Sequence, residues 1–300
     1  MIPEFPNFKK IELTDKEEIE KFTSKFLPYS DFNFVNMWSW NIKDEMRISV
    51  LNNNLVVRFT DYITGKSFYS FLGINKEVET IKELLELSKK EKLKPILKLV
   101  PEEVVKNLTG LNFDLIPDRD AHDYIYSVSH LSNMDHWTKH SSGKNIRNYN
   151  RLYPKYVVKH QSIKEIQKDE YKKMFRKWAG NKGIEDHSKL KEYEALERIL
   201  KVNQKNVKVL SIYVNNILEG FTICEILSPS YAISHFAKAN KTCHRAIGDL
   251  LNFEEAKMLN ALGIKYLNWE QDLGMLGLRK SKEKYKPSFF LKKFTISYKN

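Results

Sequence analysis

The sequence predicts an α/β (α+β) fold made of two successive domains. The chain has 300 residues, of which 42% are hydrophobic, so it can bury one large core or two ordinary ones. Segments with strand periodicity alternate with segments with helical periodicity. A similar order of elements occurs in each half of the chain. This order is typical of helices packed against one mixed sheet in each domain.

The first half begins with a helix. Thr14 and Glu17 have the spacing of a capping box, and Pro28 marks the end of the helix. The aromatic-rich stretch 30–40 predicts a buried helical turn or short helix. The other elements of this half follow from alternation or helical spacing: a hairpin at 48–59 with its turn at 52–54, strands at 67–72, 95–100 and 123–128, and helices at 78–92 and from 101.

The stretch 139–160 is expected to join the two domains, which we place at 1–138 and 161–300. Within it, a strand at 156–159 follows a helix at 144–152. Lys144, Arg147 and Arg151 project from one side of this helix, because they are spaced i, i+3 and i+7.

The second half repeats the plan of the first. Asn215 and Asn216 predict a hairpin turn, and Gly263 is suited to end the long helix before it. The expected elements are helices at about 163–178 and 189–203, strands at 208–214, 218–227 and 231–239, a long helix at 246–262, and strands at 264–269 and 289–297.

The net charge of +12 is unevenly distributed. Residues 1–138 hold 18 Lys/Arg and 22 Asp/Glu, a balance of −4, whereas residues 139–300 hold 32 and 16, a balance of +16. Residues 139–182 alone carry 13 basic and 3 acidic side chains. Because a fold does not require this asymmetry, it indicates an anionic partner for the second half: nucleic acid, an acidic membrane surface or a phosphate-bearing substrate.

Several classes of protein are disfavoured by the sequence. No run of about 18 apolar residues predicts a transmembrane helix, and the N-terminus lacks the pattern of a secretory signal. Cys224 and Cys243 form neither a metal motif nor a disulfide framework, which fits a reduced cytoplasm. His187, His235 and His244 lack the spacing of zinc ligands, so we expect them to be structural or surface residues and predict no metal site.

The segment 268–294 carries the densest set of chemically active residues. Glu270 and Asp272 directly follow the expected strand, Gly274 and Gly277 permit a turn, and a cationic run that includes Arg279 and Lys282 comes next. Acids and bases gathered at the end of a strand form a candidate site. A plainer alternative is a solvated turn followed by a basic surface helix.

Two segments also carry a family resemblance. One is Gly143-Lys144-Asn145-Ile146-Arg147-Asn148-Tyr149-Asn150-Arg151 with Tyr153-Pro154-Lys155-Tyr156, and the other holds Asn268, Glu270, Asp272-Leu273-Gly274, Gly277-Leu278-Arg279-Lys280, Lys282, Tyr285, Pro287 and Lys292-Lys293-Phe294. Together with Pro28-Tyr29-Ser30-Asp31 and Trp38, they resemble the C-terminal domain family of bacterial phosphatidylglycerol lysyltransferases. The order of elements in the second half also resembles the core of GNAT acyltransferases.

The resemblance implies two tandem GNAT-like domains, related to the Fem-type peptidoglycan aminoacyltransferases. It also implies transfer of an aminoacyl group from a charged tRNA to a lipid hydroxyl, with aminoacyl-tRNA as co-substrate and no cofactor. The expected partners are tRNA and a phospholipid acceptor or anionic membrane surface. The expected location is the cytoplasm or the inner face of the membrane.

Aminoacyl transfer requires an aligned acceptor, a proton acceptor and stabilisation of a developing oxyanion. Glu270 and Asp272 are candidates for accepting the proton or orienting the acceptor. Arg279 and Lys282 are candidates for holding negative charge. An ion pair between Arg279 and a carboxylate that caps the turn is the structural alternative. The tRNA would be held by Lys144, Arg147 and Arg151 through its phosphates. The further expected substrate contacts are Asn268, Lys238, Lys241, Arg245 and Tyr285.

Two other functions remain open at this point. An acyl-CoA-dependent GNAT enzyme would hold pyrophosphate on a glycine-rich loop before the long helix. Here the loop 239–248 has a single, late glycine, although Lys241 and Arg245 can still meet phosphates. The third possibility is a non-catalytic module that binds RNA or an anionic membrane.

Overall fold

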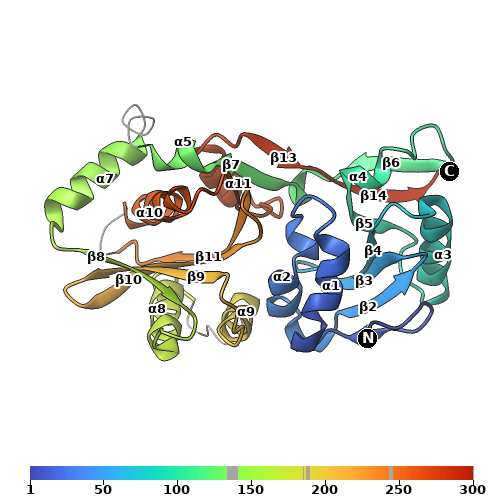
Figure 1. Cartoon of the computed structure of the whole chain (residues 1–300), viewed down its shortest axis with the longest axis horizontal. Coiled ribbons are helices and arrows are strands. Elements are labelled where there is room, and N and C mark those ends of the chain that lie inside the picture. Colours follow the sequence, from blue (N-terminus) through green and yellow to red (C-terminus); the bar gives the residue numbers. More distant parts are fainter. Residues whose placement is uncertain (134–140, 185, 187–189, 243–245, 300) are drawn as a thin grey trace. The chain divides into compact units, whose positions relative to one another are not determined.

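The structure, a computed structural model, describes residues 1–133, 141–184, 186, 190–242 and 246–299. It divides into two compact units, each built on one mixed sheet (Figure 1). The first unit comprises residues 1–123, 271–280 and 290–300, and the second comprises 124–270 and 281–289. The expected α/β class with two successive sheets is confirmed.

The first unit contains a seven-stranded sheet in the order β1-β2-β3-β4-β5-β14-β6. Its strands are β1 (Lys9–Lys10), β2 (Arg47–Leu51), β3 (Asn54–Thr60), β4 (Ser67–Leu72), β5 (Leu97–Pro101), β6 (Phe113–Pro117) and β14 (Lys293–Tyr298). Its helices are α1 (Lys16–Thr23), α2 (Phe34–Ser39), α3 (Glu77–Lys90) and α4 (Glu102–Val105). Four 3-10 turns lie at Leu13–Asp15, Ser30–Phe32, Ile42–Asp44 and Arg119–Ala121.

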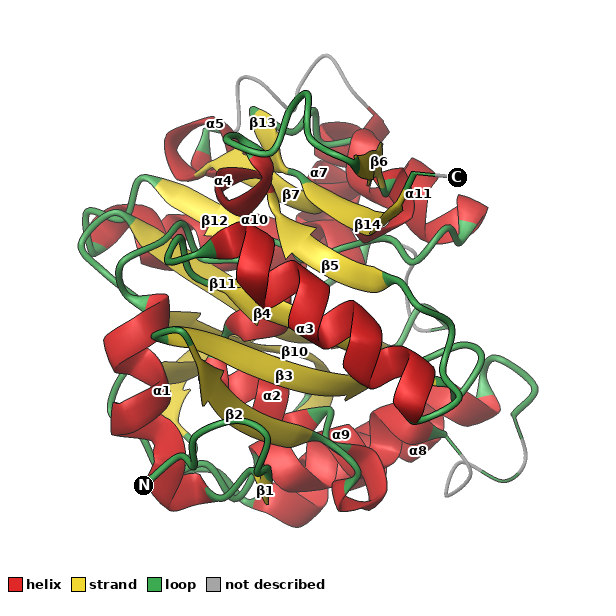
Figure 2. Ribbon diagram, turned by 90° about the vertical axis from the view of Figure 1, so that its right-hand side faces the viewer, coloured by secondary structure: helices red, strands yellow, loops and turns green. Residues whose placement is uncertain are grey.

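Helix α3 covers one face of this sheet, and α1 and α2 lie on the other (Figures 1 and 2). Ile81, Leu84 and Leu85 of α3 are fully buried against the strands, which is the face that their helical spacing predicts. The hairpin between β2 and β3 turns at Asn52 and Asn53, which both have positive φ angles of 51° and 59°. Asparagine tolerates this left-handed conformation better than most residues, so the predicted turn is confirmed.

The second unit contains the sheet β13-β7-β12-β11-β10-β9-β8. Its strands are β7 (Asp123–Ser127), β8 (Val157–Ser162), β9 (Val207–Val214), β10 (Ile217–Ile226), β11 (Tyr231–Ala239), β12 (Tyr266–Asn268) and β13 (Phe289–Leu291). Its helices are α5 (Val128–Ser132), α7 (Ser141–Leu152), α8 (Lys168–Gly180), α9 (Lys191–Ile199) and α10 (Ile247–Ala261). Helix α10 lies on one face of the sheet, and α8 and α9 lie on the other (Figure 1). The boundary between the units falls within α11 (Leu276–Glu283).

The division differs from the expected domains 1–138 and 161–300, because each half of the chain gives a strand to the sheet of the other. Strand β7, from the first half, pairs with β12 in the second sheet. Strand β14, from the end of the chain, lies between β5 and β6 in the first sheet. The single strand expected at 289–297 is therefore two strands in two sheets. Periodicity shows that a segment is a strand but carries no information about its partner.

The buried ammonium of Lys293 fixes the returning strand in the first unit. Its Nζ lies 2.7 Å from Asp123 Oδ1 and also pairs with Asp31, and all three side chains are largely or fully buried. It donates to Ser30 Oγ over 3.2 Å, and Ser30 donates to Asp123 over 2.6 Å. Burial lowers the pKa of the ammonium, but the carboxylates outweigh this and raise it above its ordinary value. Three segments distant in sequence are thereby held together.

No helix among the described residues has both the length and the apolar character needed to cross a bilayer.

We predict that Lys293→Met destabilises the protein by about 3–5 kcal/mol, because it leaves two buried carboxylates without their cation. Lys292→Ala is the matched control. The side chain of Lys292 is 53% exposed, and its ion pair with Glu102 should contribute less than about 1 kcal/mol. Urea unfolding of the three proteins measures both effects. Equal midpoints for the Lys293 variant and the wild type would contradict this role.

Candidate functional site

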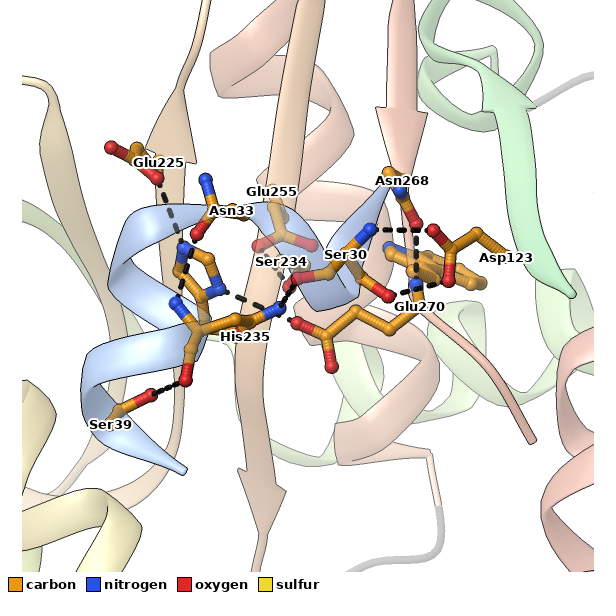
Figure 3. A network of polar contacts seen from close by, with 12 residues as sticks. Ser30, Asn33, Ser39, Asp123, Glu225, Ser234, His235, Glu255, Asn268 and Glu270 are labelled. Carbon is orange, nitrogen blue, oxygen red and sulfur yellow. Dashed lines mark hydrogen bonds and ion pairs between the residues drawn. The ribbon is translucent and has the colours of Figure 1, made fainter. Parts of the chain in front are cut away.

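Two neighbouring strands of the second sheet separate at a cluster of polar side chains. β11 and β12 run parallel and pair only from Tyr231 to Ile233, opposite 266–268. β12 ends at Asn268, whereas β11 continues to Ala239. The polar residues just beyond the last pair are Ser234 and His235 on β11 and Glu270 after β12 (Figure 3). Polar groups therefore gather where backbone pairing between the two strands stops.

His235 is placed by a β-bulge in β11. Its neighbours Ser234 and Phe236 pair with the consecutive β10 residues Cys224 and Ile223, which leaves His235 as the extra residue. A bulge redirects a side chain relative to regular alternation. Here the bulge residue has a fully buried imidazole, which lies between two carboxylates. Nε2 is 3.5 Å from Glu225 Oε2, and Nδ1 is 3.4 Å from Glu270 Oε1.

The charge state of His235 follows from opposing effects. Burial lowers the pKa of the imidazole, but Glu225 and Glu270 outweigh it and raise the pKa to about 9. A third carboxylate, Glu255 of α10, is fully buried and accepts a hydrogen bond from Ser234 Oγ over 2.9 Å. Burial raises its pKa to about 7, despite opposing hydrogen bonds and the nearby imidazole. At neutral pH the cluster therefore contains an imidazolium and a carboxyl group that is close to its own pKa.

Glu270 is the carboxylate of this cluster that reaches solvent, with 19% of its side chain exposed. Its φ angle of 58° lies in the left-handed region, which costs a non-glycine residue on the order of 1–2 kcal/mol. The backbone is held on both sides. The N–H of Glu270 donates to Asn268 Oδ1 over 2.6 Å, and its carbonyl accepts from the backbone N–H of Tyr124 over 3.1 Å. Such strain is often found at functional sites.

Lys282 supports the same turn. Its Nζ donates to the carbonyl of Trp269 and, over 3.1 Å, to that of Glu270. It also lies 5.5 Å from the centre of the Tyr124 ring. The structure thus brings the predicted residues Glu270 and Lys282 together, through the backbone of Glu270.

Asp272 and Arg279 belong to the first unit, so the expectation that the whole site lies in the second domain is wrong for these two residues. The chain returns to the first unit at residue 271. Arg279 Nε and Nη2 donate to the fully buried carboxylate of Asp272 over 2.8 and 2.9 Å, and Nη2 also pairs with Asp120. Arg119 lies 3.2 Å from Asp272. The ion pair named above as the structural alternative is therefore present.

Three other predicted contacts are buried and bonded within the second unit. Asn268 caps the Glu270 turn, as described above. The Tyr285 hydroxyl donates to Asp249 of α10, which also pairs with Lys284. Lys238 Nζ lies 3.1 Å from Glu192 and 4.0 Å from the centre of the Trp178 ring. Burial lowers the pKa of Lys238, and Glu192 partly offsets this.

The basic residues of α7 are exposed, as the sequence predicts. Lys144, Arg147 and Arg151 face solvent, whereas Ile146 and Tyr149 are fully buried on the opposite side of the helix. Lys241 is also exposed, and Arg245 lies outside the described residues. The three basic residues of α7 therefore form a solvent-exposed surface.

A shallow pocket of about 380 Å³ lies elsewhere in the second unit, and none of the predicted site residues lines it. Its lining residues are Val157, Lys159, Gln161, Glu165, Ile166, Gln167, Glu170, Tyr213 and Asn216. Within the part of the chain that is described, no group of His, Cys, Asp and Glu side chains is arranged to hold a metal ion.

Sequence reasoning missed His235, Glu225 and Glu255 as members of the cluster. A signal was present, because Glu225 and Glu255 interrupt apolar stretches of an expected strand and helix. Acids at buried positions usually have a charged partner. That partner, however, depends on the bulge in β11, which the pattern of residues does not reveal.

No curated protein matches the chain. Among solved structures, a conserved protein of unknown function from Bacteroides thetaiotaomicron is 25% identical, with a TM-score of 0.81 and coverage of 100% of both chains. The structure of L-PGS from Bacillus licheniformis is 13% identical, with a TM-score of 0.64 over 100% of this chain and 94% of that one. FemX is 9% identical, with a TM-score of 0.56 over 96% of each chain.

The last two similarities concern the fold alone, and they agree with the predicted relation to Fem-type proteins. A family model extends the comparison to the sequence. Residues 24–297 match the model described as "Phosphatidylglycerol lysyltransferase, C-terminal", and the chain therefore belongs to this family.

Proposed function

We propose that this protein transfers an aminoacyl group from aminoacyl-tRNA to a hydroxyl group of a phospholipid or another acceptor. Its family is one of acyl and aminoacyl transferases, which fits this reaction class. The observation that carries the proposal is the carboxylate of Glu270. This carboxylate reaches solvent at the point where β11 and β12 separate. It stands on a turn whose backbone has a strained, left-handed conformation and is held by hydrogen bonds.

The chemistry requires an acceptor for one proton. The acceptor hydroxyl oxygen attacks the carbonyl carbon of the aminoacyl ester while its proton passes to Glu270. The tetrahedral intermediate then collapses, the bond to the ribose oxygen of the tRNA breaks, and that oxygen takes up the proton. General base catalysis of this kind typically contributes about 100- to 10,000-fold to the rate.

The cations have separate parts in the proposal. Arg279 uses Nε and Nη2 for Asp272 and Asp120, which leaves its Nη1 group to donate to a phosphate or carbonyl oxygen. Lys282 acts on the backbone of the Glu270 turn and adds positive charge there. Asp272 then serves to orient Arg279, and Asn268 to hold the turn.

The exposed cations of α7 would bind tRNA phosphates. Arginine and lysine bind the nucleic-acid backbone without reading its sequence, which suits an enzyme that recognises an acceptor end. Helix α7 is fixed to the long helix, because Asn145 Nδ2 donates to Asp249 Oδ2 over 3.2 Å. This hydrogen bond thus helps to hold the basic face of α7 in a fixed position relative to α10.

The direct test incubates purified protein with a pool of radiolabelled aminoacyl-tRNAs and a bacterial lipid extract. Label that moves into the lipid or another acceptor fraction supports the proposal. A parallel incubation with radiolabelled acetyl-CoA tests the alternative that the protein is an acyl-CoA-dependent enzyme. Tight binding of tRNA or vesicles without any transfer would instead indicate a binding module.

We predict that Arg279→Ala lowers transfer by about 100- to 1,000-fold, because a charged contact to the transition state is lost. Arg279→Lys keeps a cation beside Asp272 but loses the bidentate geometry, so it should preserve the fold and still transfer slowly. The neighbouring exposed cation provides the control, and Lys280→Ala should transfer normally. If folded Arg279→Ala is fully active, the role of Arg279 is limited to its structural ion pair.

We predict that the triple variant Lys144→Ala, Arg147→Ala, Arg151→Ala binds tRNA at least 10-fold more weakly and with a shallower dependence on salt. Fewer phosphate contacts release fewer counterions. Filter binding between 50 and 200 mM salt measures both quantities. The control removes three exposed lysines of α3 in the first unit, Lys82, Lys89 and Lys90, and should bind like the wild type. An equal loss in both triple variants would show a nonspecific charge effect.

A further inference from the structure

The buried imidazole behind Glu270 touches neither substrate of the reaction proposed above. His235 is fully buried, so it cannot touch a substrate. It nevertheless lies beside the one carboxylate of the cluster that reaches solvent.

The imidazole is anchored from its far side. Glu225 is fully buried on β10, and its Oε1 accepts a hydrogen bond from Asn206 Nδ2 over 3.0 Å, while Oε2 faces His235 Nε2. Because Glu225 is held, the ring is held, and its Nδ1 is directed at Glu270. The bulge at His235 gives this orientation to the ring from within the strand.

Both ring nitrogens face carboxylate oxygens, and both can donate only when the ring is an imidazolium. The charged groups around the ring come from three elements: Glu225 from β10, Glu255 from α10 and Glu270 from the turn after β12. Glu225 and Glu270 support the charged ring, whereas Glu255 exchanges its own proton near neutral pH. The ring can therefore remain a double donor throughout the neutral range.

The carboxylate of Glu270 is consequently positioned through its contact with the ring. Its Oε1 faces the imidazole, and its backbone is fixed by Asn268 and Lys282. Figure 3 shows the second oxygen directed away from the ring. A carboxylate that is held through Oε1 has both of its oxygens in a defined direction. Such orientation is what a proton acceptor needs in a transfer reaction.

We infer that His235 is a positioning residue, which orients the Glu270 carboxylate as an imidazolium held by Glu225. This inference rests on the proposed function for the role of Glu270. The contact itself can be tested without any activity. The arrangement differs from a Ser-His-Asp relay, because the imidazolium stays charged and moves no proton during the reaction.

The first experiment follows histidine protonation by NMR of protein labelled with ¹⁵N-histidine. At pH 7.5 we expect both nitrogens of His235 to be protonated, with loss of the proton near pH 9. Glu270→Gln and Glu225→Gln should each lower this midpoint by about one pH unit or more, since each removes one negative charge that favours the imidazolium. A midpoint near the ordinary value of 6.5, or one that Glu270→Gln leaves unmoved, would overturn the inference.

The second experiment measures transfer by His235→Gln, with Glu270→Gln for comparison. We expect kcat to fall about 10- to 100-fold in His235→Gln while KM for aminoacyl-tRNA stays within about twofold, since orientation rather than binding is lost. Glu270→Gln should lose at least as much. The matched control is His160→Gln, which changes an exposed histidine of β8 in the same sheet and should keep wild-type kinetics.

The outcomes separate the two proposals. If the wild type transfers and folded His235→Gln keeps its kcat, the positioning role is wrong and the proposed function stands. If the wild type transfers no aminoacyl group to any acceptor, the proposed function fails, and the NMR titration alone decides whether His235 holds Glu270. If His235→Gln does not fold, the Glu225→Gln variant replaces it, because it removes the anchor and leaves the imidazole in place.

Discussion

The buried ammonium of Lys293 is the interaction on which the first unit depends. Taking a charge out of water costs several kcal/mol, and this cost is recovered only where opposite charges and hydrogen bonds surround it. Asp123, Asp31 and Ser30 supply these groups. Because they come from separate segments of the first part of the chain, the ammonium can be satisfied only when the last strand has returned to the first sheet.

This return determines where the candidate residues lie. The chain leaves the second unit after Glu270 and enters the first at residue 271. Glu270 and Asp272 are two positions apart in sequence. Glu270 nevertheless pairs with groups of the second unit, and Asp272 pairs with groups of the first. The change of direction accompanies left-handed backbone at Glu270, Leu273 and Gly274, with φ angles of 58°, 55° and 72°. Only glycine adopts this conformation without strain, so bonds to the backbone must hold the other two.

In the second unit, an irregularity in strand pairing determines where the candidate residues lie. The short pairing of β11 with β12, and the bulge at His235, bring one imidazole and three carboxylates together in the second sheet. A regular strand would direct His235 differently and remove the imidazolium that faces the buried carboxylate of Glu225, which is costly. The cluster therefore depends on a break in regular strand geometry, and the cluster in turn positions the partly exposed carboxylate of Glu270.

Much of the fold follows from local patterns. Periodicity, turn asparagines and Gly263 predict most strands and helices within a few residues, because these signals act between near neighbours in the chain. Composition and the spacing of Lys144, Arg147 and Arg151 likewise predict an exposed basic face. The motif around Asn268–Phe294 indicates the family, which its match over residues 24–297 confirms. Only the tertiary structure decides that β7 and β14 exchange sheets, that Asp272 pairs with Arg279, and that His235 lies between Glu225 and Glu270. Each of these outcomes depends on contacts between distant segments and on the energetic cost of burying a charge, neither of which a local pattern encodes.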